Sequence, residues 1–267
     1  MSTLHEHVGQ LLRQHLDAPG ALPDRLNNAL RVLAKYRATL IQNTVIQQCG
    51  ATVQGGPFQG MQFVNHSAEG CHVPKLLGCY ESELHSHILA AAGRGYGSVI
   101  NIGAAEGYYA VGLARLMPFA HVYAHDTNEA AHPVCRSLAA RNGVADRVTV
   151  GGLFLGEDFA RFAGQRTLVV CDIEGGETEL LDPIRYPALT AMDLIVELHD
   201  SQAARPSVLI PERFAATHDV TMVRHVMQAV ALPALFDRLG HLDQLLAVWE
   251  WRSAPTPWAV MRTRTIE

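Results

Sequence analysis

The feature that most constrains the fold is a short apolar stretch followed by two glycines near the middle of the chain. Residues 99–102 are rich in β-branched side chains, Gly103 and Gly107 come next, and apolar residues then recur at helical spacing from Tyr109. This order predicts a strand, a tight turn and a helix. Glycines let a ligand approach the backbone, and the first turn of the helix offers N–H groups to it. The stretch therefore predicts the start of a nucleotide-binding fold.

An acidic residue follows the next predicted strand. That strand covers residues 121–124, and Asp126 lies about twenty residues beyond the glycines, where a carboxylate can accept hydrogen bonds from both hydroxyls of a ribose. The spacing of Gly103 and Gly107 departs from the three-glycine pattern that holds the pyrophosphate of a dinucleotide. A cofactor without a pyrophosphate fits this turn better.

The turn resembles the first motif of the class I S-adenosylmethionine (SAM) methyltransferases, in which an acidic residue precedes a pair of glycines four positions apart. Asn101 lies where that acid is expected, and Glu106 is a candidate for the missing negative charge. The resemblance implies that SAM is the cofactor. The residues that it implies for SAM binding are Asn101, Gly103, Glu106, Gly107, Tyr108 and Asp126.

Further segments resemble the FkbM-like branch of that family, over roughly residues 56–200. A lead-in to the first strand contains the stretches 56–61 and 74–81, and two later strands end in Asp-Ile-Glu-Gly-Gly-Glu and Val-Glu-Leu-His. This resemblance implies that Tyr80 and Glu83 belong to the SAM pocket. It also implies methylation of an oxygen atom in a small molecule or glycan. The residues after 200 match no substrate class.

From residue 98 onward, predicted strands alternate with predicted helices. Alternation at this spacing predicts an α/β fold with a parallel sheet covered on both faces. The resemblance implies a Rossmann-like, mostly parallel sheet of seven strands that is closed by an antiparallel pair. We expect the SAM-binding domain to cover residues 96–267. After the strand at 121–124, strands are expected at 147–150, 167–172, 194–198, 220–223 and 258–261, and helices at 129–141, 158–162 and within 228–246.

Residues 1–95 are expected to form a helical and hairpin cap. Apolar residues recur at near-helical spacing over 22–48, and the glycine-rich stretch 50–70 suggests a small hairpin. A further helix is expected at 81–92. The apolar stripe of the long helix needs a partner, which is the main domain, a second copy of the chain or the substrate. A homodimer through this helix is therefore one of the open alternatives.

Two predicted strands are apolar until they end in carboxylates. Asp172 and Glu174 follow the fourth strand, and Glu197, His199 and Asp200 follow the fifth. Period-two geometry places Asp172 beside Glu174, and Glu197 beside His199, if the extended conformation continues that far. Ligands of open parallel sheets bind outside the carboxyl ends of the strands, so these side chains are expected to meet a substrate.

Three roles are open for these polar strand ends. His199 is the natural general base because its pKa lies near neutrality, with Asp172 and Glu197 as its partners. In a second interpretation, Asp172, Glu197, His199 and Asp200 form a site for Mg, Ca or Mn, which would lower the pKa of an acceptor hydroxyl. In a third, the carboxylates are a structural network. Glu177 is expected to stabilise the first turn of a helix through its dipole.

The amino-acid composition narrows the classes of molecule that the protein is expected to bind. The 21 Lys and Arg residues against 26 Asp and Glu give a net charge of −5 without any dense basic tract, which argues against binding to nucleic acid or to a membrane surface. No signal peptide or long apolar run is apparent. Five cysteines without a Cys-x-x-Cys pair indicate reduced thiols. We expect a cytoplasmic protein with a small-molecule acceptor.

The sequence says less about the positions of the remaining histidines and of the tryptophans. His85, His87, His225 and His241 lack metal-ligand spacing and are expected on the surface or in packing. The tryptophans at 249, 251 and 258 are expected to pack the closing strands or to line an acceptor pocket.

The leading hypothesis is a SAM-dependent methyltransferase that acts on a hydroxyl of a natural product or sugar. A nicotinamide-dependent oxidoreductase is an alternative, although the missing third glycine counts against it. A non-catalytic module that binds SAM or a nucleoside is another. Such a module would need Gly103, Gly107 and Asp126 but not Asp172 or His199.

Overall fold

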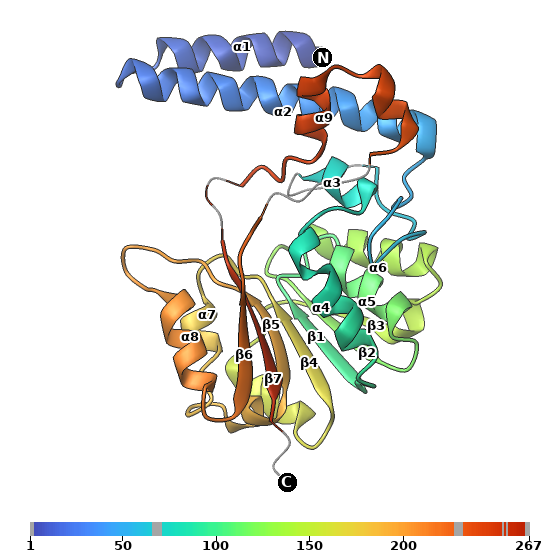
Figure 1. Ribbon diagram of the computed structural model, residues 1–267, viewed down its shortest axis with the longest axis vertical. Coiled ribbons are helices and arrows are strands. Elements are labelled where there is room, and N and C mark those ends of the chain that lie inside the picture. The colour runs from blue at the N-terminus through green and yellow to red at the C-terminus, as the bar shows by residue number, and fades with distance from the viewer. Residues whose placement is uncertain (1–2, 66–70, 227–231, 253, 255, 265–267) are drawn as a thin grey trace.

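The computed structural model describes residues 3–65, 71–226, 232–252, 254 and 256–264. Its centre is a seven-stranded sheet in the order β3-β2-β1-β4-β5-β7-β6 (Figure 1). β7 runs antiparallel to both β5 and β6, and the other neighbours are parallel. The predicted α/β fold with a closing antiparallel pair is confirmed. The strands are β1 (Ser98–Ile102), β2 (His121–His125), β3 (Val148–Gly151), β4 (Thr167–Cys171), β5 (Asp193–Glu197), β6 (His218–Val223) and β7 (Trp258–Thr263).

The central strands are buried along their whole length, as expected for parallel strands covered on both faces. Successive side chains of β1 enter two different cores, with Val99 in one and Ile100 in the other. The register pairs Ile102 with both His125 and Cys171. The ends of β1, β2 and β4 are therefore level, and the residues that follow them meet at one edge of the sheet.

The helices largely follow the predicted pattern. The long helix is confirmed at Leu22–Cys49, whereas the segments expected to be helical at 81–92 and 158–162 contain 3-10 turns. Part of the helix expected within 228–246 lies outside the described residues. The helices are α1 (Leu4–Asp17), α2 (Leu22–Cys49), α3 (His72–Leu77), α4 (His85–Ala92), α5 (Tyr108–Leu116), α6 (Ala131–Arg141), α7 (Glu177–Leu180), α8 (Pro206–Phe214) and α9 (His241–Ala247).

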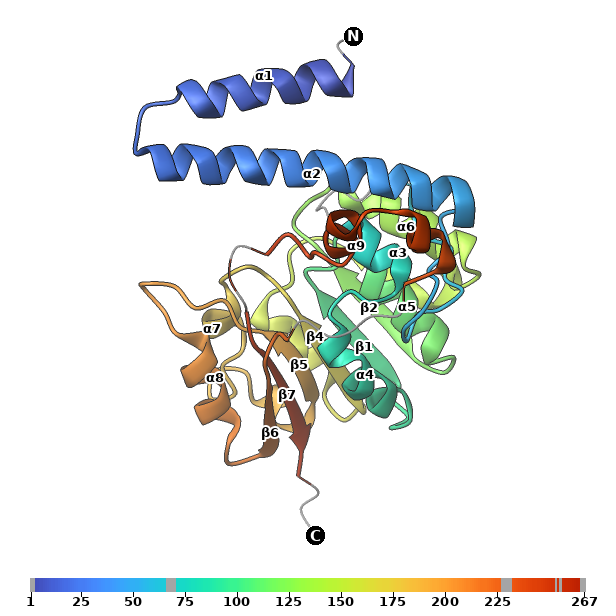
Figure 2. The same cartoon turned by 45° about the horizontal axis from the view of Figure 1, so that its top comes forward.

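An unpredicted helix, α1, lies along the side of α2 turned away from the sheet (Figure 2). Thr3 and Glu6 form a reciprocal capping box at its start, in which each side chain accepts from the backbone N–H of the other residue. This signal was present in the sequence, but no residue of α1 is buried. In the described part of the expected hairpin, an antiparallel bridge joins Thr52 to Gln62, and backbone hydrogen bonds run from Val53 N to Met61 O and from Phe63 N to Ala51 O. No helix in the described ranges is both long and apolar enough to span a bilayer.

The N-terminal region packs on the sheet domain. Ile41, Val45 and Phe63 belong to the same buried core as Val99 of β1. The guanidinium of Arg37 also donates two hydrogen bonds of 2.6 Å to Asp243 in α9. The core is therefore continuous across the expected domain boundary, and α2 is held against the C-terminal part of the chain.

Candidate active site

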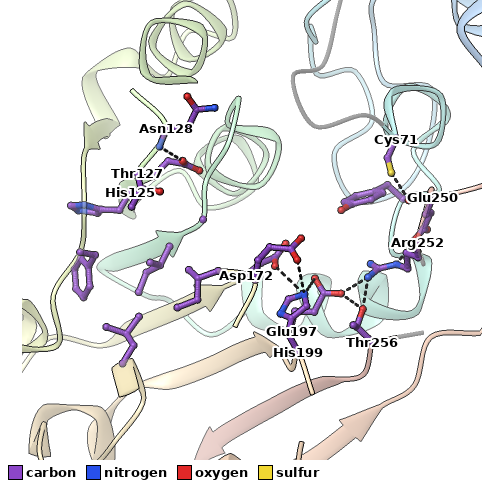
Figure 3. A pocket seen from close by; sticks show the side chains of 18 of the residues that line it. Cys71, His125, Thr127, Asn128, Asp172, Glu197, His199, Glu250, Arg252 and Thr256 are labelled. Carbon is purple, nitrogen blue, oxygen red and sulfur yellow. Dashed lines mark hydrogen bonds and ion pairs between the residues drawn. The ribbon is translucent and has the colours of Figure 1, made fainter. Parts of the chain in front are cut away.

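A cavity of about 770 Å³ lies at the carboxyl ends of the parallel strands (Figure 3). One half is lined by residues that follow β1, β2 and β3. The other half is lined by residues that follow β4 and β5, by the segment 71–80 and by the segment 250–256. This is the edge at which open α/β sheets bind their ligands.

Gly103 lines the first half of the cavity, but its lack of a side chain serves a close contact within the protein. Its φ is +80°, and a Cβ atom there would lie 1.6 Å from the backbone oxygen of Asp172. The end of β1 therefore passes directly against the end of β4, which only glycine permits. Gly107 also has a positive φ, but a Cβ there would meet Cys135 Sγ at 2.7 Å. Gly107 thus packs α5 on α6 and lies outside the cavity lining.

Asp126 lines the cavity where the sequence places a ribose-binding acid. Its carboxylate accepts hydrogen bonds of 2.7 Å from the backbone N–H groups of Ala105 and Asn128. These bonds tie the end of β2 to the glycine turn. The acid is therefore held rigidly at the wall of the first half of the cavity, called the nucleotide half below.

Three of the residues expected to bind the cofactor lie elsewhere. Asn101 is buried in β1, donates to Val170 O at 3.5 Å, and its Oδ1 atom accepts no hydrogen bond within the described part of the chain. Tyr108 packs among aromatic rings that include Phe63, and Glu83 Oε1 lies 2.9 Å from His225 Nδ1. Asn101 thus bonds the neighbouring strand β4, Tyr108 packs in the core and Glu83 contacts the C-terminal part of the chain. None of the three is part of the lining.

Glu106 does not supply the missing charge to the cavity either. It is 1% exposed, and its Oε1 atom accepts a 2.9 Å hydrogen bond from Lys75 Nζ. Lys75 lines the cavity. Tyr80 lines it too, as expected. Sequence reasoning missed Lys75, although lysine occurs only here and at position 35.

His199 lies at the centre of the second half (Figure 3). Its Nδ1 donates to Glu177 Oε1 at 2.7 Å, and its Nε2 lies 3.7 to 3.8 Å from carboxylate oxygens of Asp172, Glu174 and Glu197. The structure thus brings together Asp172, Glu197 and His199 as expected. Glu177 is in the first turn of α7, but it is also the partner that orients the imidazole, a role that the sequence did not reveal.

The charges of this group perturb its pKa values. Burial lowers the pKa of His199, but the hydrogen bond to Glu177 and the charge of Glu197 outweigh burial and raise it. Burial and the charge of Glu197 raise the pKa of Asp172 well above its ordinary value. Perturbed titrating groups that share a cleft are typical of catalytic sites.

The possible cation ligands differ from the expected set. Ligand atoms of Asp172, Glu174 and His199 lie within 4.8 Å of one another. The extended conformation ends at Cys171, and a left-handed turn at Glu174 brings its side chain back to the group. Asp200 is not part of it, because its carboxylate accepts hydrogen bonds from Ser207 at the start of α8.

Arg252 connects the carboxylates in the second half of the cavity, and the sequence did not predict this role. Its guanidinium donates to Glu197, to Glu81 at 2.6 Å and to Glu250 at 3.0 Å. Burial and the charge of Glu197 raise the pKa of Glu81 to about 8. Trp251, beside the arginine, lines the cavity, whereas the tryptophan at 258 is packed within β7.

Comparisons with protein-family models and with curated protein sequences gave no match. Among solved structures, the chain is similar to the O-methyltransferase TomG from Streptomyces achromogenes in complex with SAM, at 15% identity and a TM-score of 0.46 over 71% of this chain and 82% of that chain. It is also similar to an O-methyltransferase from Bacillus cereus in complex with SAH, the demethylated product, at 12% identity and a TM-score of 0.47 over 97% and 100%. Because these values are low, we infer the function from the residues of the site.

Proposed function

We propose that this chain is a SAM-dependent methyltransferase that transfers a methyl group to a hydroxyl of a small molecule or sugar. The observation that carries the proposal is the juxtaposition of two halves in one cavity. One half has a glycine turn and a ribose-type acid. The other half has an oriented histidine surrounded by carboxylates. A methyltransferase needs both, because the methyl donor and the nucleophile must be held in line.

The nucleotide half fits SAM. Gly103 lines the cavity at the end of β1, and Asp126 is fixed where it can bind the ribose hydroxyls. Phe154 and Leu153, after β3, add apolar lining farther along the same wall. When bound, SAM supplies a methyl group on a positively charged sulfur atom. The glycine spacing is less suited to a nicotinamide dinucleotide, whose pyrophosphate needs the three-glycine turn.

In this proposal His199 is the general base. Glu177 accepts from Nδ1, so the neutral imidazole presents Nε2 to the cavity, where it can take the proton of an acceptor hydroxyl. The nearby carboxylate of Glu197 stabilises the imidazolium that forms. A non-catalytic binding module would have no use for this oriented base. The same residues support placement in the FkbM-like branch, because the two motifs behind that resemblance converge here.

A divalent cation is a second possibility for the same group. Asp172, Glu174 and His199 would hold it, with Glu177 orienting the histidine, and the cation would lower the pKa of the acceptor hydroxyl. We expect turnover to survive dialysis against a chelator, because His199 can act as a base without a metal. If the chelator abolished turnover and magnesium, calcium or manganese restored it, the cation and not His199 would be the group that activates the acceptor hydroxyl.

Asp126→Ala is expected to weaken SAM binding by roughly 1.5 to 3 kcal/mol, because hydrogen bonds to a charged group are lost. Titration calorimetry with SAM and SAH measures this loss. Asp146→Ala, in the turn before β3, is the control and should leave affinity unchanged. Unchanged affinity in Asp126→Ala would contradict the assignment of the nucleotide half. Binding of NADH in place of SAM would contradict the proposed function.

The N-terminal helices are proposed to form a homodimer. Leu22, Leu26, Leu30 and Leu33 recur along α2 at helical spacing and are 45% to 65% exposed. An uncovered stripe of this kind can pair with the same stripe of a second copy. We expect the double variant L26E/L30E to shift the protein from dimer to monomer in sedimentation experiments. Phe119→Glu, at a residue that is 92% exposed elsewhere, should leave the dimer intact. A monomeric wild-type protein would refute the proposal.

The free state of all five cysteines agrees with a reducing compartment. We therefore propose that the enzyme acts in the cytoplasm.

A further inference from the structure

The order of the strands gives the cavity a direction. Residues after β3 and β2, including Phe154 and Asp126, lie at one end, and Asp172 after β4 lies beyond Gly103. A nucleoside whose ribose is bound by Asp126 therefore has its base toward β3 and its remaining part toward β4. For SAM, that remaining part is an amino acid with a carboxylate and an ammonium group.

Lys75 lines the cavity beside the glycine turn, and several contacts fix it there. Its ammonium group donates to Glu106, which belongs to the glycine turn itself. It also lies 5.1 Å from the ring centre of Tyr80 and 5.7 Å from that of Tyr108. Aromatic faces attract a cation and restrict its position. The ammonium group is thus held against the turn over which the cofactor passes, although the side chain is only 5% exposed.

The other strongly basic side chain in the described lining is Arg252, and its donors point elsewhere. They bind the carboxylates of Glu81, Glu197 and Glu250 and the hydroxyl of Thr256. Arg252 therefore binds the acidic side chains in the second half of the cavity. A ligand carboxylate in that half would meet the acidic side chains of Glu197 and Asp172, whereas near Lys75 it would meet a cation.

We propose that Lys75 binds the carboxylate of the amino-acid part of SAM, an inference that rests on the proposed function. An ammonium group has three N–H donors, so it can bind Glu106 in the turn and a second carboxylate on the ligand. Charge-assisted hydrogen bonds of this kind are stronger than neutral ones. Lys75 then selects a cofactor that carries an amino acid over a plain nucleoside.

A structural role is the competing explanation, in which Lys75 only neutralises the buried Glu106. The double variant K75M/E106Q separates the two, because it removes both charges of this pair together. If Lys75 only neutralises Glu106, the double variant binds cofactor as the wild type does. If Lys75 binds the ligand, the double variant remains weak.

The experiment is a calorimetric titration with SAH and with decarboxylated SAH, which lacks only the carboxylate. We expect the wild type to bind SAH roughly ten- to a hundredfold more tightly than the decarboxylated form. The double variant should bind both forms equally, at the affinity of the decarboxylated form. The Lys75→Arg variant should keep part of the preference, and Arg185→Met, at an exposed basic residue outside the lining, should keep all of it.

The outcomes distinguish this inference from the proposed function. A wild-type protein that binds neither ligand would overturn the proposed function. A wild-type protein that binds both forms equally would overturn only the role of Lys75, and this result needs no variant to fold. An undiminished preference for SAH in the double variant would also overturn it.

Discussion

Replacing His199 by alanine is expected to lower turnover about a hundredfold or more while leaving the affinity for SAM nearly intact. The imidazole lies in the acceptor half of the cavity, where Glu177 orients it, and not at the wall that holds the nucleotide. Its loss should therefore affect proton removal rather than cofactor binding. Turnover is measured with an acceptor that the wild type methylates, and SAM affinity by calorimetry.

The control for this substitution is His121→Ala. His121 lies at the start of β2, at the opposite edge of the sheet, and its Nε2 is 2.7 Å from Thr149 Oγ1. Turnover should be unchanged in this variant. If His199→Ala also keeps its turnover, the polar ends of β4 and β5 are structural and the proposed base is wrong.

The pH dependence of the wild type offers a second view of the same residue. A base acts in its deprotonated form, so its rate falls as the pH drops below its pKa. Because the pKa of His199 is raised by Glu177 and Glu197 in spite of burial, this acidic limb should lie above the pKa of an ordinary histidine. The limb should be absent in His199→Ala. A limb in the range of an unperturbed carboxylate would point to another base.

Gly103→Ala is expected to destabilise the protein by more than about 3 kcal/mol and to abolish SAM binding. Its positive φ disfavours any side chain, and a Cβ atom would overlap the backbone oxygen of Asp172 at 1.6 Å. Relief of this overlap would separate β1 from β4 at the point where the cofactor crosses the sheet. Denaturant titration gives the free energy of unfolding, and calorimetry gives the affinity.

Gly97→Ala is the matched control, because no atom lies within 4 Å of a Cβ built there. Its free energy of unfolding should change little. A Gly103→Ala protein with wild-type stability would show that the ends of β1 and β4 are not in the close contact described above.

Much of the fold could be predicted because its signals are local. The apolar run before Gly103, the helical spacing after it and the alternation of later strands each depend on residues close together in the chain. The positions of Gly103 and Asp126 follow from the same order, since the carboxyl ends of parallel strands share one edge of the sheet. The approach of Asp172, Glu197 and His199 to one another was predictable for the same reason.

The direction of individual side chains was decided only by tertiary structure. Asn101 and Tyr108 are next to the glycine turn in sequence, but Asn101 bonds Val170 of β4 and Tyr108 packs in the core. Asp200 is next to His199, yet it accepts from Ser207 at the start of α8. A motif gives the neighbours of a residue along the chain, whereas packing decides which way the residue faces.

The sequence also did not predict which charged residues pair with one another at the site, because the paired residues come from segments far apart in the chain. Lys75 reaches Glu106 across 31 positions, and Arg252 reaches Glu81 across 171. No local periodicity relates such residues, since only the folded chain brings their charges together. The sequence by itself thus determined the sheet, the glycine turn and the acidic strand ends. The tertiary structure decided which charged side chains meet there, because burial makes each charge depend on a partner from elsewhere in the chain.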